Sequence, residues 1–193
     1  GRDKHVARPG ISRNALDSGF PDVLDPTFGV AHSTTSALDH EGPMRQTRRL
    51  RVNAPVHKVW ELIDDDRKLP LWMPNVISTR YPNGKPKADP VGTRFIQEMS
   101  ENGKISTYEG EVTEYQPGKL LGVLLLPEAF AIHVVYHVEG DEDWTLLDYG
   151  CDVKPKTWKG RLMLFLGRKM LNSILDQQLA RLKRVAETGK AAV

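Results

Sequence analysis

The pattern of hydrophobic and polar residues changes near residue 44. Residues 1–43 contain many Pro, Gly, Ser and Thr residues without sustained periodicity, which predicts an extended arm or linker. From residue 44 to 193 the pattern is regular, and we predict one folded domain there. The apolar pieces Phe20 to Leu24 and Pro26 to Val30 could dock on a neighbouring surface, and an undocked tail fits equally well.

A strand over 46–52 and a short helix open the regular part. Asn53 is a candidate N-cap, and Pro55 suits the first helical turn, where no N–H is required. The run Asp64 to Asp66 should end this helix, because negative charge at a helix C-terminus opposes the macrodipole, and we expect a solvated turn there. One helix face is apolar through Val56, Val59, Trp60 and Ile63.

A second short helix or turn is predicted over 69–74, and strands follow it. Their short connections indicate antiparallel pairing. The predicted strands cover 76–81, 92–99, 105–116, 120–126, 130–139 and 145–153. From 157 to 188 the period becomes helical, and a curved sheet would be needed to bury such a helix. Its predicted apolar stripe is Met163, Leu164, Gly167, Leu171, Ile174, Leu175, Leu182 and Val185.

The order and turn residues of these elements resemble START-like domains of the polyketide cyclase/dehydrase type in the SRPBCC superfamily. The resemblance covers about residues 45–188 and is carried by four stretches: Val52 to Asp64 with Leu69 to Pro74, Val91 to Phe95, Gly110 to Leu120, and Trp144 to Tyr149. It implies an α+β helix-grip fold, in which a curved antiparallel sheet of about six to seven strands wraps a long C-terminal helix. It also implies a ligand cavity between the sheet and the helix.

Alternation within the strands predicts which side chains face that cavity. Charged residues mark the outer face of each strand, so the opposite residues point inward. The predicted ligand-binding residues combine an apolar wall with a few polar groups. They are Trp72, Phe95, Gln97, Tyr108, Val112, Tyr136, Tyr149, Met163, Gly167 and Leu171. Gly167 indicates either a gap that admits a ligand or close packing of helix on sheet.

The composition argues against nucleic-acid binding, a disulfide framework and a membrane-spanning segment in this chain. A net charge of +2 gives no electrostatic case for nucleic acid, and the arginines at 49 and 51 fit a solvated strand face. The single cysteine, Cys151, alternates with apolar residues and fits a buried position. The sequence has no apolar run long enough to span a membrane. Gly1 in place of methionine suggests a truncated chain, so cytoplasmic localisation is only the default.

Catalytic and metal sites are not predicted. His133 and His137 share a strand face but lie too far apart to chelate one metal, and the sequence motifs of hydrolases and nucleotide-binding sites are missing. We therefore expect no cofactor and no catalytic group. The predicted function is binding of a small hydrophobic molecule (a lipid, polyketide or quinone-like compound) by a carrier or sensor.

Two alternatives remain at this point. One is a cyclase or dehydratase acting on an aromatic or polyketide substrate in the same cavity. The other is a protein-interaction module of the chaperone-activator type, with contacts near Arg48 and along Met163 to Leu166. That apolar helical run could also cover the cavity mouth, form a homodimer contact or touch a membrane surface. It could instead lie beneath the N-terminal arm, and the arm would then act as a lid.

Overall fold

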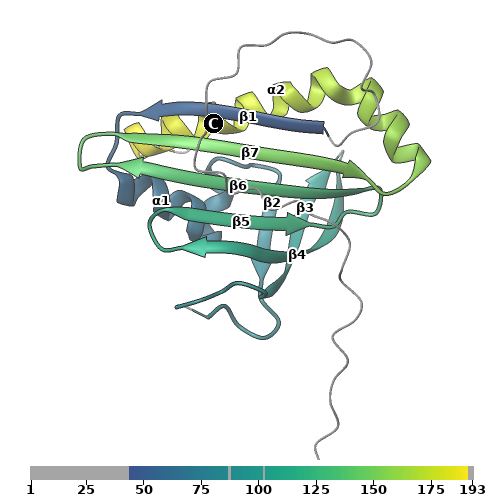
Figure 1. Ribbon diagram of the computed structural model, residues 1–193, viewed down its shortest axis with the longest axis horizontal. Coiled ribbons are helices and arrows are strands. Elements are labelled where there is room, and N and C mark those ends of the chain that lie inside the picture. Colours follow the sequence, from purple (N-terminus) through teal and green to yellow (C-terminus); the bar gives the residue numbers. More distant parts are fainter. Residues whose placement is uncertain (1–43, 87, 102, 191–193) are drawn as a thin grey trace, which may run out of the picture. The chain divides into compact units, whose positions relative to one another are not determined.

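The computed structural model describes residues 44–86, 88–101 and 103–190. The predicted arm over 1–43, with its docking and lid hypotheses, lies outside the described residues. Within them the elements follow the predicted order (Figure 1). They are β1 Met44–Val52, α1 Val56–Asp64, the 3-10 helix η1 Asp66–Leu71, β2 Val76–Arg80, β3 Arg94–Glu101, β4 Lys104–Gln116, β5 Leu120–Leu125, β6 Phe130–Gly140, β7 Thr145–Pro155 and α2 Trp158–Thr188.

The strands form one antiparallel sheet in the order β1-β7-β6-β5-β4-β3-β2. Strand β1 joins the far edge by pairing with β7, while the remaining neighbours are consecutive hairpins. The predicted alternation is confirmed on β6 and β7, where Val134, Tyr136 and Tyr149 are buried on the face that carries the helices. The fold is therefore the α+β helix grip that the resemblance implied.

Helix α2 runs back along β7 and β1, and three contacts fix its path. Arg48 Nε donates to Asp176 Oδ1 at 2.7 Å, Lys183 Nζ donates to the Arg51 carbonyl at 2.7 Å, and the Asn53 N–H donates to Glu187 Oε1 at 2.8 Å. These contacts hold the C-terminal half of α2 to β1. The N-terminal half starts three residues after β7 and lies at the other end of the same strands (Figure 1).

The packing of the inward face differs between the two ends of the sheet. Around the C-terminal half of α2, Val52, Val59, Leu147 and Leu182 are all 0 % exposed. Towards the N-terminal half of α2 several inward-facing residues are only partly buried, although Met44, Phe95 and Val153 at this end are buried. These partly buried residues are Met99, Val123, Leu125, Phe130, Ile132, Leu164 and Leu171. The apolar face of the sheet is thus sealed at one end and incompletely covered at the other.

Two local predictions are corrected. Helix α1 begins at Val56 with Pro55 as its N-cap, so Asn53 does not cap it. The first helical N–H, on Val56, donates instead to the Asp141 carbonyl at 2.9 Å, in the turn between β6 and β7. The acidic run ends α1 as predicted, but it is not a simple solvated turn, because Asp65 caps η1 and its neighbours bind other side chains.

The predicted stripe of α2 is correct only in its C-terminal half. Leu175, Leu182 and Val185 are buried as expected, together with Leu179 and Ala186, which the prediction omitted. Met163 and Ile174 are instead exposed. The described helices include none long and apolar enough to cross a membrane.

Candidate functional site

Three rows of inward-facing residues, set by the strand register, form the floor of the candidate site. The row nearest the sealed end contains Tyr149, Tyr136, Leu121 and Tyr115. The middle row contains Cys151, Val134, Val123 and Val112. The outermost row contains Val153, Ile132, Leu125, Gly110 and Phe95. In the outer two rows Val123, Leu125 and Ile132 are only partly buried, so the floor is incompletely covered around these three residues.

A chain of aromatic rings closes the inner end of this floor. Trp72 packs edge-on against Tyr136 with ring centroids 6.2 Å apart, and Tyr136 packs against Tyr149 at 5.3 Å. The indole N–H of Trp72 donates to the buried Leu62 carbonyl at 2.8 Å, which fixes the ring from behind. Three predicted site residues are thus in one rigid group. Trp72 is fully enclosed and packs on the inward-facing ring of Tyr136, so it closes the inner end of the floor.

The outer end of the floor depends on a glycine. A Cβ atom on Gly110 of β4 would collide with the ring of Phe95 on β3 and approach the Leu124 carbonyl. The missing side chain therefore lets Phe95 lie flat across the neighbouring strand. Beside it, Gln97 is buried and its Nε2 donates to Thr79 Oγ1 at 3.1 Å, while Tyr108 is half-buried.

The hydroxyl groups on the floor are neutral hydrogen-bonding groups. Burial raises the pKa of Tyr136 and of Tyr149 above the ordinary value of 10.0, and it raises the pKa of Tyr108 to about 12. Burial likewise raises the pKa of the Cys151 thiol to about 11. Such groups donate hydrogen bonds at neutral pH and do not accept protons as general bases. The floor therefore suits binding and orientation of a ligand better than proton transfer.

The three site residues predicted on α2 lie in different surroundings. Leu171 packs partly buried against the core, and Met163 is 59 % exposed, apart from the buried group. A Cβ atom on Gly167 would meet nothing within 4 Å. Close helix–sheet packing therefore does not account for Gly167, and the alternative of open space beside it agrees with the structure.

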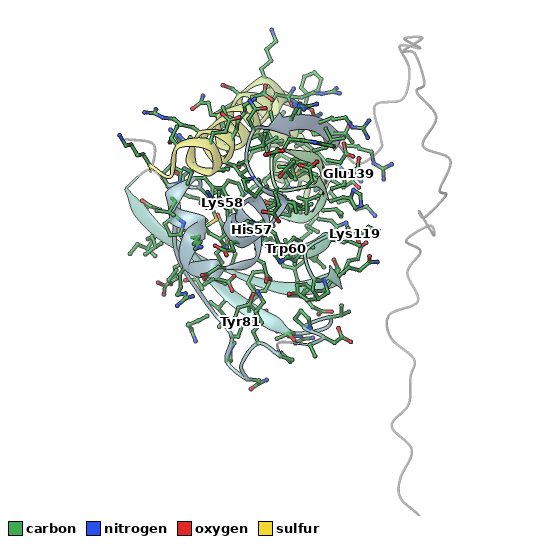
Figure 2. All side chains as sticks on the ribbon, turned by 90° about the vertical axis from the view of Figure 1, so that its left-hand side faces the viewer. His57, Lys58, Trp60, Tyr81, Lys119 and Glu139 are labelled. Atoms are coloured by element: carbon green, nitrogen blue, oxygen red, sulfur yellow. The ribbon has the colours of Figure 1, made fainter. Side chains whose placement is uncertain are left out.

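A cluster of charged groups at the end of α1 was missed by the sequence prediction. Lys85 Nζ lies 3.1 Å from Asp64 Oδ1 and 3.4 Å from Asp66 Oδ2. Tyr115 OH donates to Asp64 at 3.2 Å, and Tyr81 OH donates to Asp66 at 3.2 Å. Figure 2 views this side of the domain, with Trp60 on α1 and Tyr81 below it. Only Asp64 to Asp66 stood out in the sequence, since Lys85 comes from a distant turn.

This cluster borders an open pocket of about 280 Å³ lined by Asp64, Lys85, Pro86 and Tyr115. Burial raises the pKa of Asp66 above its usual range, although Lys85 beside it acts in the opposite sense. The carboxylates already accept bonds from Lys85 and the two tyrosines, so the cluster holds α1 against β4 and the β2–β3 connection. No group of three or more His, Cys, Asp or Glu residues suited to a metal ion occurs in the described part of the chain.

The arginines of β1 are matched to acidic partners. Arg45 and Arg49 each make two hydrogen bonds to aspartates on β7, Asp152 and Asp148, at distances between 2.6 and 3.2 Å. Arg48 points to the opposite face and binds Asp176 of α2. The basic residues of this strand are therefore largely used within the domain.

The curved antiparallel sheet under a long helix defines this protein as a helix-grip domain, and its partly covered apolar face is the candidate site. The chain belongs to the polyketide cyclase/dehydrase and lipid transport family, whose model matches residues 44–187. A comparison with curated proteins found no match.

Several solved structures share the fold. A START superfamily protein from Mycobacterium smegmatis has a TM-score of 0.57 at 15 % identity, covering 75 % of this chain and 99 % of that one. The Zhui aromatase/cyclase from Streptomyces sp. R1128 gives 0.57 at 15 % identity, covering 78 % and 99 %. The di-domain aromatase/cyclase StfQ of the steffimycin pathway gives 0.59 at 16 % identity, covering 79 % and 54 %. At these identities the similarity concerns the fold.

Proposed function

We propose that this protein binds a small, largely apolar molecule between the N-terminal half of α2 and the floor, as a carrier or sensor. The observation that carries the proposal is the difference in packing along α2. Leu182 is fully enclosed, whereas Leu164 and Leu171 on the same helix, and Ile132 below them, are only partly buried. An apolar floor left open at one end is the expected form of a site that admits a hydrophobic ligand.

The chemistry of the floor narrows the class of ligand. Its partly buried residues Val123, Leu125 and Ile132 are aliphatic, while the hydroxyls of Tyr136 and Tyr149 lie at the inner end. A ligand that enters with a ketone, quinone or phenol oxygen first would place that oxygen near hydrogen-bond donors and leave its apolar body on Val123 and Ile132. A polyketide or quinone-like compound fits this arrangement better than a simple fatty acyl chain.

Native mass spectrometry of the full chain, followed by organic extraction, tests whether a passenger molecule is bound. A titration with a fluorescent aromatic probe then locates the site. Ile132→Trp should fill the floor and weaken probe binding about tenfold or more, which corresponds to ~1.4 kcal/mol. Val135→Trp is the matched control, because Val135 lies on the opposite face of the same strand between Gly122 and Gly150.

Probe binding by the two variants distinguishes a site on the floor from a site elsewhere. Weaker binding by Ile132→Trp with unchanged binding by Val135→Trp, at equal thermal stability, supports the proposal. An empty wild-type protein that also binds no probe would reject it. Equal weakening of probe binding by both variants would show that the probe does not bind on the floor.

A cyclase role is the second candidate, and it is favoured by the tyrosine hydroxyls on the floor and by the similarity to two aromatase/cyclases. Neutral hydroxyls could hold a poly-ketone chain in a bent form by donating to its carbonyl oxygens. Among the described residues of the three floor rows, however, the titratable groups are Tyr115, Tyr136, Tyr149 and Cys151. Burial raises the pKa of all four, so they are protonated at neutral pH and do not act as general bases. Binding therefore remains the first candidate.

A further inference from the structure

The outer side of the first half of α2 carries an exposed apolar surface. Trp158, Leu166 and Met170 are 72 %, 73 % and 67 % exposed, and Leu162 and Met163 are more than half exposed. Trp158, Leu162, Leu166 and Met170 follow one another at intervals of four residues, so their side chains form a continuous ridge. We call these four residues together with Met163 the α2 patch. Contiguous apolar surface of this kind marks an interaction site.

Positive charge surrounds the α2 patch. Lys159, Arg161, Arg168 and Lys169 lie on the same helical segment, and no Asp or Glu occurs from Trp158 to Leu175. Within the described residues, none of these four cations pairs with a carboxylate; Lys159 instead lies 5.9 Å from the ring centre of Trp158. The chain as a whole has a net charge of only +2, so this local excess is concentrated on one surface.

We propose that the α2 patch docks on an anionic lipid membrane surface. An apolar ridge flanked by Lys and Arg, with a Trp at its end, matches the composition of helices that lie in the interface of a bilayer. The cations would meet acidic headgroups while the ridge enters the acyl boundary. A second copy of the chain fits less well, because a symmetric contact would bring the four cations of each protomer close to those of the other.

This docking would also place the ligand site next to the bilayer. Leu164 and Leu171, on the same helical segment, are partly buried and pack against the core. A hydrophobic molecule could then pass between the membrane and the floor without crossing bulk water. The docking inference itself does not depend on the proposed ligand, since vesicle binding and probe binding are measured separately.

Vesicle flotation with the full chain tests the proposal. We expect binding to phosphatidylcholine vesicles that contain about 30 % phosphatidylglycerol, little binding to phosphatidylcholine alone, and weaker binding at high salt. Trp158 is the only exposed tryptophan of the four, so its fluorescence should shift to shorter wavelength on binding, and Trp158→Phe should remove that shift. Equal binding to both vesicle types, or no binding to either, would overturn the proposal.

Paired variants identify the surface. Leu162→Glu/Leu166→Glu should abolish vesicle binding, whereas Ile105→Glu, at a site 69 % exposed on β4, should not. Arg161→Gln/Lys169→Gln should weaken binding about fivefold for each cation removed, and Arg80→Gln/Lys104→Gln serves as the control. Sedimentation velocity tests the alternative that the α2 patch is a contact between two copies of the chain. A dimer that Leu166→Glu dissociates, without vesicle binding, would assign the patch to a second copy and reject the membrane.

Discussion

The ring of Tyr136 packs edge-on against the ring of Tyr149, with centroids 5.3 Å apart, on adjacent strands of the inward face. The pair lies where the sealed half of the core meets the half-covered floor. Its rings contribute to the core, while its hydroxyls provide polar groups at the inner end of the candidate site. Packing and recognition can therefore be separated by removing the oxygen atoms alone.

Tyr136→Phe and Tyr149→Phe should change the free energy of unfolding by no more than about 1 kcal/mol, because the ring contacts remain. Each should weaken binding of a carbonyl-bearing aromatic probe about tenfold if its hydroxyl donates to the ligand, and leave a hydrocarbon probe unaffected. Since burial raises the pKa of both tyrosines, wild-type affinity should stay constant with pH up to 10.0. Equal losses for both probes would show a packing effect instead.

Two glycines should respond oppositely to alanine. Gly167→Ala should raise the free energy of unfolding by about 0.5–1 kcal/mol, because alanine favours the helix and its Cβ meets nothing within 4 Å. Gly110→Ala should lower it by about 1–3 kcal/mol, because Phe95 would be displaced. Urea unfolding followed by circular dichroism measures both. A loss of stability in Gly167→Ala would show that the space beside the helix is filled.

The pKa values of two neighbouring aspartates, Asp65 and Asp66, are shifted in opposite directions, so the two should affect stability oppositely as pH changes. Burial raises the folded-state pKa of Asp66 above 3.8, so protonated Asp66 favours folding at low pH and this contribution is lost as pH rises. Asp66→Asn should therefore stabilise the protein at neutral pH, and the gain should shrink as pH falls towards 3.8. Urea unfolding at a series of pH values measures this difference.

Asp65→Asn is the matched control. The hydrogen bond from Arg67 lowers the folded-state pKa of Asp65 below 3.8, so its contribution is present above that pH and is lost as pH falls. This variant should lose less than about 1 kcal/mol at neutral pH, because the ion pair is largely exposed and asparagine still caps η1. Changes of the same sign in both variants would contradict the assigned environments.

Cys151 lies in the middle row of the floor, so its reactivity reports on access to that row. Its thiol is 3 % exposed, and burial raises its pKa to about 11, so alkylation of the native protein at pH 8 should be slow compared with the unfolded chain. Pulsed alkylation followed by mass spectrometry measures the rate. A ligand on the neighbouring Val134 and Val123 should slow it further. Rapid labelling of the native protein would show that this part of the floor opens to solvent.

Much of this architecture could be predicted from the sequence, because its signals are local. Alternation set the inward face of β6 and β7, turn residues set the antiparallel order, and helical periodicity placed α2 within a residue of its observed start at Trp158. The burial of Phe95, Tyr136 and Tyr149 followed from the same alternation. Periodicity records which face of an element is apolar, and that was sufficient for these features.

The tertiary structure alone decided which elements meet and how completely they cover one another. Lys85 joins Asp64 and Asp66, and Arg48 reaches Asp176, across sequence separations that no local pattern encodes. The apolar stripe of α2 continues in sequence through Met163, but the sheet buries only its C-terminal half. The length of the strands and the path of the helix across them set that limit. They leave part of the floor incompletely covered and an exposed basic and apolar surface on the outer side of α2.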